Sequence, residues 1–324
     1  MNREERKERV RQFFRRWKDW WTLPDFRLHS TNLVPREGAF PEIPPREDAP
    51  EELKSALRFD SDRILAGSTT VFKQITLKVE RHPAWQKDYL SGVDVETIKS
   101  STHLNHRKLP NGGDVKLIWE LSRWGHLVRL AQEAYILNDR WSMKLAIRQV
   151  YHWARHNSPM NGYNWTSALE GGLRLINYCW IDALTLATAS NKRLGDMSEE
   201  VGNSLSKLRK LVLPAHVWFV WRYKSFGSSA NNHLLGELSG LICALSRWPQ
   251  LEKWAAPLDQ IQSLWEEEVL KQFAPDGGNR EQALNYHLFS FELCWQSYLA
   301  LNQTGRAVSP EVFERLQRAA DYFV

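Results

Sequence analysis

From residue 114 to its end, the sequence places apolar residues three and four positions apart, the spacing of amphipathic helices. The expected helices cover residues 114–135, 141–155, 167–189, 198–223, 232–247, 257–273, 279–302 and 310–323. Short polar, Gly or Pro breaks separate them, so consecutive helices must pack as antiparallel pairs. Several helix hairpins in series predict an all-α fold, a ring or solenoid of helices. No fixed-period repeat is present, which argues against the standard repeat families.

The first 50 residues differ from this helical region. Residues 1–22 form a basic amphipathic segment in which aromatic residues such as Phe13 and Trp17 alternate with arginines and lysines. We expect a helix whose aromatic face docks on the rest of the protein, and a helix on a membrane surface is the alternative. Residues 23–50 are rich in Pro and predict a connecting arm. We therefore divide the chain into an extension over 1–50 and a helical domain over 51–324.

Residues 69–79 are β-branched and partly alternating, and they are the one good strand candidate. The fold is thus expected to contain at most one small β element. The three cysteines, Cys179, Cys243 and Cys294, lie within apolar helical patterns without close spacing. Buried free thiols are expected rather than disulfides or a zinc knuckle.

The composition and charge of the chain indicate which classes of ligand it could bind. The chain has 16 tryptophans, more than core packing usually needs, and exposed indoles would suit sugar rings. A Trp-rich helical core explains them equally well. The formal net charge of +5 and the pI of about 9.0 favour an anionic partner. Lys and Arg are dispersed and no nucleic-acid-binding motif is present, so nucleic acid is not expected as a partner.

The amino terminus shows no apolar segment, and no stretch has the length of a membrane span. Taken as written, the chain is expected to be cytoplasmic; with a natural signal removed beforehand, it would be periplasmic. The sequence does not indicate the oligomeric state.

Polar and aromatic residues concentrate at three junctions where a loop enters a helix. The junctions are NGYNWTSALE at 161–170, SSANNHLLGE at 228–237 and PDGGNREQALNYH at 275–287. In an antiparallel ring, alternate connections lie on one face, so three helices that run the same way gather their amino-terminal ends at one mouth. Free N–H groups and the helix dipole favour a carboxylate there. We therefore expect an acidic ligand at these junctions.

Several segments together resemble the heparinase II/III-type polysaccharide lyases and related alginate lyases. They are DRILAG at 62–67, DVKLIWELSRWGHLVRLAQEAY at 114–135, the pattern of Asn164, Trp165, Glu170 and Arg174, NNH at 231–233, and PDGGNREQALNYH. Their order and spacing are more specific than any one of them. The resemblance implies an incomplete α/α toroid, the amino-terminal domain of an enzyme that cuts a uronate-containing glycan by β-elimination.

The resemblance also implies site residues. The catalytic ones are Asn232, His233 and Tyr286, and the substrate-binding ones are Asn164, Trp165, Glu237, Arg280 and His287. In β-elimination the substrate carboxylate gains charge as the C5 proton leaves, and an amide such as that of Asn232 stabilises the charge by hydrogen bonding. The phenol of Tyr286 can give a proton to the departing oxygen at C4. The alternative is that Tyr286 acts as a base, which requires cations such as Arg280, His233 and His287 to lower its pKa. His233 would act as base or neutralise the carboxylate, and Glu237, one turn further on, would orient its imidazole.

The same residues have structural explanations. Asn commonly caps helices, and a helical Tyr usually packs on an apolar face. Glu170 and Arg174 have the spacing of an ion pair on a helix surface. His152 and His156 have the spacing of a metal-binding pair but lack the Glu of the zinc-protease pattern, so no metal is expected there.

Family members usually continue into a carboxy-terminal β-sandwich that contributes a further histidine and, in several members, a metal. This chain ends at Val324 in or just after a helix, so we expect that half to be absent and the chain itself to hold no cofactor. The isolated chain is then expected to bind an acidic polysaccharide, with its own activity in question.

Two other functions stay open. A glycoside hydrolase needs two carboxylates beside the bond, and Asp276 and Glu281 are the candidates. A non-catalytic module that binds an acidic glycan needs neither. The sequence does not indicate which uronate polysaccharide is bound, or whether it is sulfated.

Overall fold

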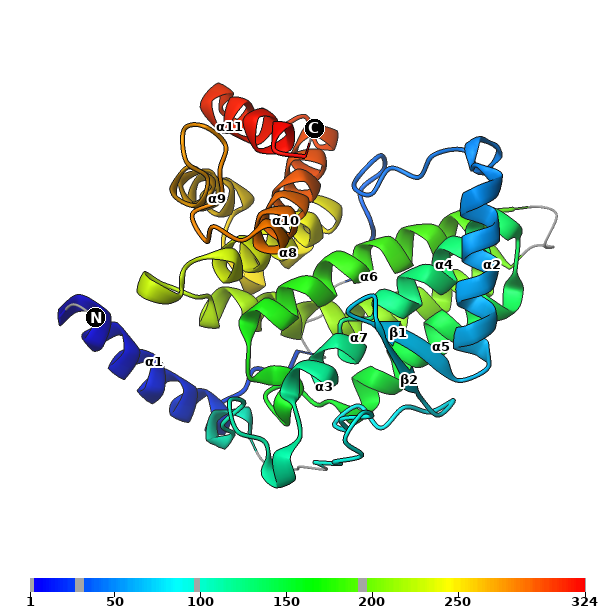
Figure 1. The fold of residues 1–324 in the computed structure, drawn as a ribbon, viewed down its shortest axis with the longest axis horizontal. Helices are drawn as coiled ribbons and strands as arrows, with labels where there is room; N and C mark the ends of the chain where they lie inside the picture. The colour runs from blue at the N-terminus through cyan, green and yellow to red at the C-terminus, as the bar shows by residue number, and fades with distance from the viewer. Residues whose placement is uncertain (1–2, 27–31, 96–99, 192–196, 324) are drawn as a thin grey trace. The chain divides into compact units, whose positions relative to one another are not determined.

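The computed structural model describes residues 3–26, 32–95, 100–191 and 197–323, which form helices and one small hairpin (Figure 1). The predicted all-α class is confirmed. The chain packs as two compact units, which we call unit 1 and unit 2. Unit 1 consists of Met1–Glu42, Ala168–Ile176 and Leu213–Val324, and unit 2 of Ile43–Ser167 and Asn177–Val212. The division at residue 50 stays a prediction.

Unit 1 is built around one buried helix, α8 (Asn232–Arg247). Every residue of α8 other than His233 is buried. It packs on α9 (Leu258–Gln272) and α10 (Leu284–Gln303), and both of these contact α11 (Pro310–Asp321). The remaining elements are α1 (Arg3–Trp21), the start of α6 (Ala168–Ala189), the end of α7 (Ser198–Tyr223), and the 3-10 turns η6 (Gly227–Ser229) and η7 (Pro249–Trp254).

Glycines allow α6 to cross α8 at close range inside unit 1. A Cβ added to Gly172 would lie 2.5 Å from the carbonyl oxygen of Gly236, and one added to Gly240 would lie 2.4 Å from that of Gly172. Backbone atoms cannot yield at such distances, so only glycine fits at this crossing. The crossing fixes the start of α6 against the helix that begins with Asn232.

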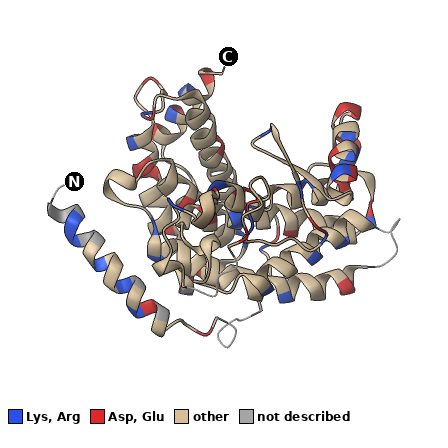
Figure 2. Cartoon of the chain, turned by 60° about the horizontal axis from the view of Figure 1, so that its bottom comes forward, with Lys and Arg blue, Asp and Glu red and all other residues tan. Residues whose placement is uncertain are grey.

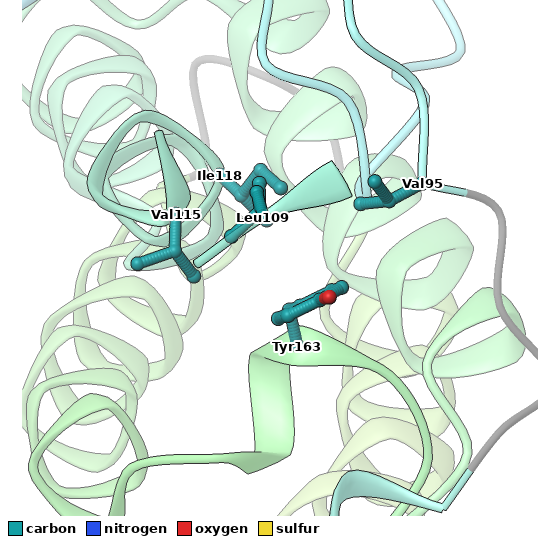
Figure 3. Close-up of a cluster of buried hydrophobic side chains, with 5 residues drawn as sticks. All are labelled: Val95, Leu109, Val115, Ile118 and Tyr163. Atoms are coloured by element: carbon teal, nitrogen blue, oxygen red, sulfur yellow. The ribbon is translucent and has the colours of Figure 1, made fainter. Parts of the chain in front are cut away.

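Unit 2 pairs α4 (Gly125–Leu137) with α5 (Arg140–His156) and α2 (Glu51–Leu65). Its antiparallel hairpin joins β1 (Ser68–Val71) to β2 (Ile75–Lys78). The remaining elements are α3 (Val115–Ser122), the rest of α6 and α7, and the 3-10 turns η1 (Arg46–Asp48), η2 (Ser101–His103), η3 (Pro110–Gly112) and η4 (Tyr163–Trp165). Figure 3 shows one core cluster of this unit, which contains Val95, Leu109, Val115, Ile118 and Tyr163.

Most predicted helices are found within two residues of their expected ends, and α7 and α8 match at both ends. The prediction over 114–135 was wrong in one respect, because the buried Trp124 takes a φ of 70° and splits the segment into α3 and α4. The strand predicted over 69–79 is a hairpin. Phe72 and Lys73 turn it at φ values of 50° and 60°, without the Gly or Asn that usually signals such a turn. Helix α2 was missed because it buries only Leu57 and Ser61.

The amino-terminal helix forms as predicted but does not bury its aromatic face. Five side chains on α1 are each more than half exposed: Val10, Phe13, Phe14, Trp17 and Trp21. Basic residues recur along the same helix (Figure 2). The helix is held near its end, where the buried Asp19 accepts hydrogen bonds from Arg222, at 2.6 Å, and from Tyr223. The expected docking of the aromatic face is therefore not seen.

The tryptophans fall into a buried set and an exposed one. The largest fully buried side chains include Trp124, Trp153, Trp165, Trp248 and Trp265. Trp141, by contrast, is 72% exposed. The three cysteines are buried and free, as predicted.

Candidate functional site

Two of the three polar junctions meet in unit 1. Asn232 is the first residue of α8, and Glu281 lies just before α10. The side-chain amide of Asn232 donates to both carboxylate oxygens of Glu281, at 2.7 and 2.9 Å, and its backbone N–H donates to Oε1 at 3.1 Å. The side chain of Asn231 caps the helix by accepting from the N–H of His233 at 3.1 Å. The starts of α8 and α10 are thus joined through a bound carboxylate.

This contact shows what the start of α8 can hold. Asn232 is only 4% exposed, and its donors converge on an acceptor group at a helix amino terminus, where the dipole favours negative charge. Glu281 is partly exposed, and its carboxylate accepts the hydrogen bonds that these donors make. The sequence had suggested Glu281 only as a hydrolase carboxylate. Its role as the partner of Asn232 was missed, because the two residues are 49 positions apart.

Tyr286 and His233 are accessible at the same two helix starts. Tyr286 lies in the first turn of α10 and is 50% exposed. His233 is the second residue of α8 and is exposed, although the rest of that helix is buried. Because α8 packs on α10, the three predicted catalytic residues belong to neighbouring helix starts, and two of them face solvent. Such an arrangement exposes an imidazole and a phenol beside the amide of Asn232, which Glu281 occupies.

Of the predicted binding residues beside Tyr286, one is exposed and one is not. Arg280 is exposed in the turn before α10. His287 is buried, with Nδ1 accepting from the N–H of Asn279 at 3.3 Å and Nε2 donating to the carbonyl of Ala319 at 2.8 Å. Both ring nitrogens are therefore used, and His287 ties the junction to α11 instead of facing a substrate.

Glu237 is buried and therefore cannot contact a ligand. Both of its carboxyl oxygens accept from Ser225, one from the backbone N–H at 2.6 Å and one from the hydroxyl at 2.9 Å. Burial raises the pKa of Glu237 to about 8, so it keeps its proton at neutral pH. Its described contacts fasten the segment after α7 to α8, and the prediction that it orients His233 or binds substrate is corrected accordingly.

Residues 161–167 of the first junction lie in unit 2, where Asn164 and Trp165 are packed in the interior. Asn164 is fully buried, and its amide donates to the carbonyl of Trp85 at 2.9 Å and to Asn157 Oδ1 at 2.8 Å. The indole of Trp165, 2% exposed, donates to the carbonyl of Asn157 at 3.1 Å. Tyr163 lies in the apolar cluster of Figure 3. Buried in this way, Asn164 and Trp165 offer no face to a sugar, so the predicted binding roles are replaced by structural ones.

Glu170 and Arg174 lie in the interior of unit 1, not on a helix surface as predicted. Nε of Arg174 donates to Nε2 of His216 at 2.9 Å. Because both side chains are buried, they belong to the packing of this unit.

The two histidines of α5 lie side by side with their ring planes tilted by 31°. The rings of His152 and His156 lie 4.0 Å apart, and His152 Nδ1 accepts from the indole of Trp85 at 2.9 Å. Within residues 3–26, 32–95, 100–191 and 197–323, no group of three or more His, Cys, Asp or Glu side chains is arranged to hold a metal ion. Over the same residues, no helix is both long and apolar enough to cross a membrane.

Comparison with solved structures places the fold. A heparinase III with methylated lysines matches with a TM-score of 0.54 and 17% identity, over 98% of this chain and 46% of that one. Another heparinase III gives a TM-score of 0.57 at 16% identity, over 98% and 44%. The heparan sulfate lyase HepC from Pedobacter heparinus gives 0.56 at 14%, over 92% and 42%. The chain shares the helical fold of these heparinase III structures.

The resemblance inferred from the sequence motifs is thus confirmed at the level of fold. No family model matches the sequence, and no curated protein sequence matches it. The chain spans less than half the length of each matched structure. At 14 to 17% identity the match concerns the fold alone, and the chemistry has to be argued from the residues of this chain.

Proposed function

We propose that this chain is the helical part of a polysaccharide lyase that cleaves an acidic, uronate-containing glycan by β-elimination. One observation supports the proposal: the amide of Asn232 donates to the carboxylate of the chain's own Glu281 at the start of α8, beside the helix start that presents Tyr286. The fold shared with heparan sulfate lyases supports the same chemistry. The net charge of +5 favours an acidic substrate.

In the proposed reaction a base removes the proton from C5 of the uronate. The electron pair forms the double bond between C4 and C5, the bond from C4 to the bridging oxygen breaks, and that oxygen takes a proton. Negative charge grows on the uronate carboxylate as the C5 proton leaves. A donor aimed at this charge is worth roughly a hundred- to a thousand-fold in rate.

Each catalytic residue has one task in this scheme. The amide and N–H of Asn232 donate to the substrate carboxylate, which takes the place that Glu281 fills. Tyr286, half exposed, gives its proton to the departing oxygen. His233 removes the C5 proton and is the base of the scheme. No metal or cofactor is assigned to these residues.

The test follows the unsaturated uronate, which absorbs ultraviolet light, as the chain acts on a set of uronate polysaccharides. Tyr286→Phe is expected to lower the rate by roughly a hundred- to ten-thousand-fold, because the proton donor is lost while the ring remains. The control is Tyr151→Phe, which removes a hydroxyl from another exposed tyrosine. Turnover by Tyr286→Phe equal to that of the control, or no cleavage of any uronate polysaccharide, would contradict the proposal.

The hydrolase alternative finds less support. Asp276 Oδ1 accepts from the N–H of Gly278 within its own turn, at 2.9 Å, whereas Glu281 faces Asn232. Products without a double bond, formed at a rate that collapses in Asp276→Asn, would favour hydrolysis over elimination.

A further inference from the structure

Unit 2 contains a cavity of about 890 Å³ that the sequence analysis did not identify. Its walls come from one face of α5, from the end of α2, from the start of β1 and the end of β2, and from one residue each of α3 and α4. Figure 1 labels these elements. All of its lining residues belong to unit 2. The residues of the proposed catalytic site belong to unit 1, so the cavity is a separate feature.

Positive charge dominates the lining. Four basic side chains line the cavity, and all four are exposed: Lys78, Arg81, Lys144 and Arg148. None of them forms an ion pair with a residue in the described part of the chain. The one acidic side chain of the lining, Glu80, is bound by Lys87 and Tyr89. A cavity with four cations and one engaged carboxylate attracts anions.

An exposed indole stands among these charges. Trp141, Lys144 and Arg148 follow one another at three- and four-residue spacing, so they share a face of α5. Trp141 is 72% exposed, in contrast to the buried tryptophans of this unit. The opposite face of α5 buries Met143, Val150 and Trp153 and anchors the helix. An indole face beside cations suits a ligand with flat apolar patches and negative groups, which is the chemistry of an acidic sugar chain.

The inner part of the lining carries no further charge at neutral pH. Nε2 of His126 lies 3.1 Å from Oε1 of Gln149. Burial lowers the pKa of His126 to about 4, so its imidazole is neutral under ordinary conditions. Leu121 also lines the cavity and is apolar. The cations are therefore the groups available to meet a charged ligand.

We propose that this cavity is a second, non-catalytic site that binds a segment of an acidic oligosaccharide. Carboxylate or sulfate groups pair with Lys78, Arg81, Lys144 and Arg148, while one sugar ring stacks on Trp141. Charge-assisted hydrogen bonds of this kind are the strong ones in ligand recognition. The choice of a glycan over another polyanion rests on the proposed function, whereas the cavity and its charge do not.

The experiment measures binding of a size-defined, sulfated uronate oligosaccharide by calorimetry, with the Tyr286→Phe chain as background so that the ligand stays intact. Trp141→Ala and Arg148→Gln are each expected to weaken the binding at this site by about tenfold, through loss of the stacking surface or of a charged hydrogen bond. The matched controls lie on the same helix and outside the cavity. They are Tyr151→Ala, an exposed aromatic, and Arg155→Gln, which changes the charge equally.

The outcomes separate the two proposals. Equal weakening by Arg148→Gln and Arg155→Gln would show unspecific charge attraction and overturn the site. Equal affinity for a neutral oligosaccharide would overturn it as well, and tighter binding of a single-stranded nucleic acid would overturn the glycan assignment. If Trp141 and Arg148 govern binding but the native chain cleaves nothing, the cavity stands and the lyase proposal falls. If cleavage depends on Tyr286 while the cavity variants bind like the background, the lyase proposal stands and the second binding site falls.

Discussion

The first junction and the pair formed by the second and third are built from the same kinds of residue, yet they behave in opposite ways. In unit 2, the amide of Asn164 and the indole of Trp165 donate inward to Trp85 and Asn157, and nothing of either side chain faces solvent. In unit 1, Asn232 holds a carboxylate that is partly exposed. Asn beside an aromatic at a helix start thus predicts either a packed turn or a binding site.

The difference comes from which acceptors lie nearby. A buried loop must satisfy its own carbonyl groups, and the first junction uses its amide and indole for that purpose. At the second junction, Asn231 takes over the capping of α8, which leaves the amide of Asn232 for Glu281. A binding site at a helix start therefore needs one polar side chain more than the capping of the helix and the buried carbonyl groups require.

The largest expected effect on stability belongs to the packed junction. Trp165→Ala should lower the free energy of unfolding by about 3–5 kcal/mol, because it empties a fully buried site. Denaturant unfolding measures the change. The control is Trp141→Ala, expected within about 0.5 kcal/mol of the parent because Trp141 is exposed. Similar losses for both variants would erase the contrast between buried and exposed indoles.

Glu237 tests the comparison further. It belongs to the second junction by sequence, but its side chain is buried like those of Asn164 and Trp165 in the first junction. Its pKa is about 8 in the folded chain, against 4.5 for an ordinary Glu, so between these values the folded state holds a proton that the unfolded state has lost. The free energy of unfolding should therefore fall as pH rises from about 4.5 to about 8, by on the order of a few kcal/mol.

Glu237→Gln cannot ionise and should lack this component, so its stability relative to the parent should increase with pH across that window. Urea titrations at several pH values measure the difference. A constant difference between the two proteins would show that Glu237 is ionised in the folded chain.

The two asparagines should separate stability from activity. Asn164→Ala leaves the carbonyl of Trp85 and Oδ1 of Asn157 without this donor and should cost about 1–3 kcal/mol. Asn232→Ala should cost less, because water can reach the partly exposed Glu281, but it should lower lyase activity by roughly a hundred- to a thousand-fold. Unfolding and product formation are measured on both variants. Full activity in Asn232→Ala would contradict the catalytic role of Asn232.

The smallest effect is expected at α1. Phe13→Ser combined with Trp17→Ser should change the free energy of unfolding by less than about 0.5 kcal/mol, because both rings are exposed. Thermal and urea unfolding follow it, with Asp19→Ala as the comparison that should destabilise, since Asp19 is buried and bound by Arg222. A large loss from the serine pair would mean that the aromatic face is docked after all.

The helices could be predicted because their apolar residues recur at intervals of three and four positions, as in α7 and α8. The break at Trp124 could not, since a bulky buried residue with positive φ has no local signal. Asn232 and Tyr286 were predicted as catalytic from motif resemblance and stay a prediction, whereas the contact between Asn232 and Glu281 is seen only in the structure. The burial of Glu237 and His287 depends on Ser225 and Ala319, which are distant in sequence from any pattern around them.

The central claim is that the joined starts of α8 and α10 carry out an elimination. The most direct measurement is nuclear magnetic resonance of the products formed from a uronate polysaccharide labelled with deuterium at C5. Elimination predicts that the new non-reducing end has lost the label and carries a double bond between C4 and C5, and that Tyr286→Phe forms this product far more slowly. A saturated end that keeps its deuterium would contradict the account.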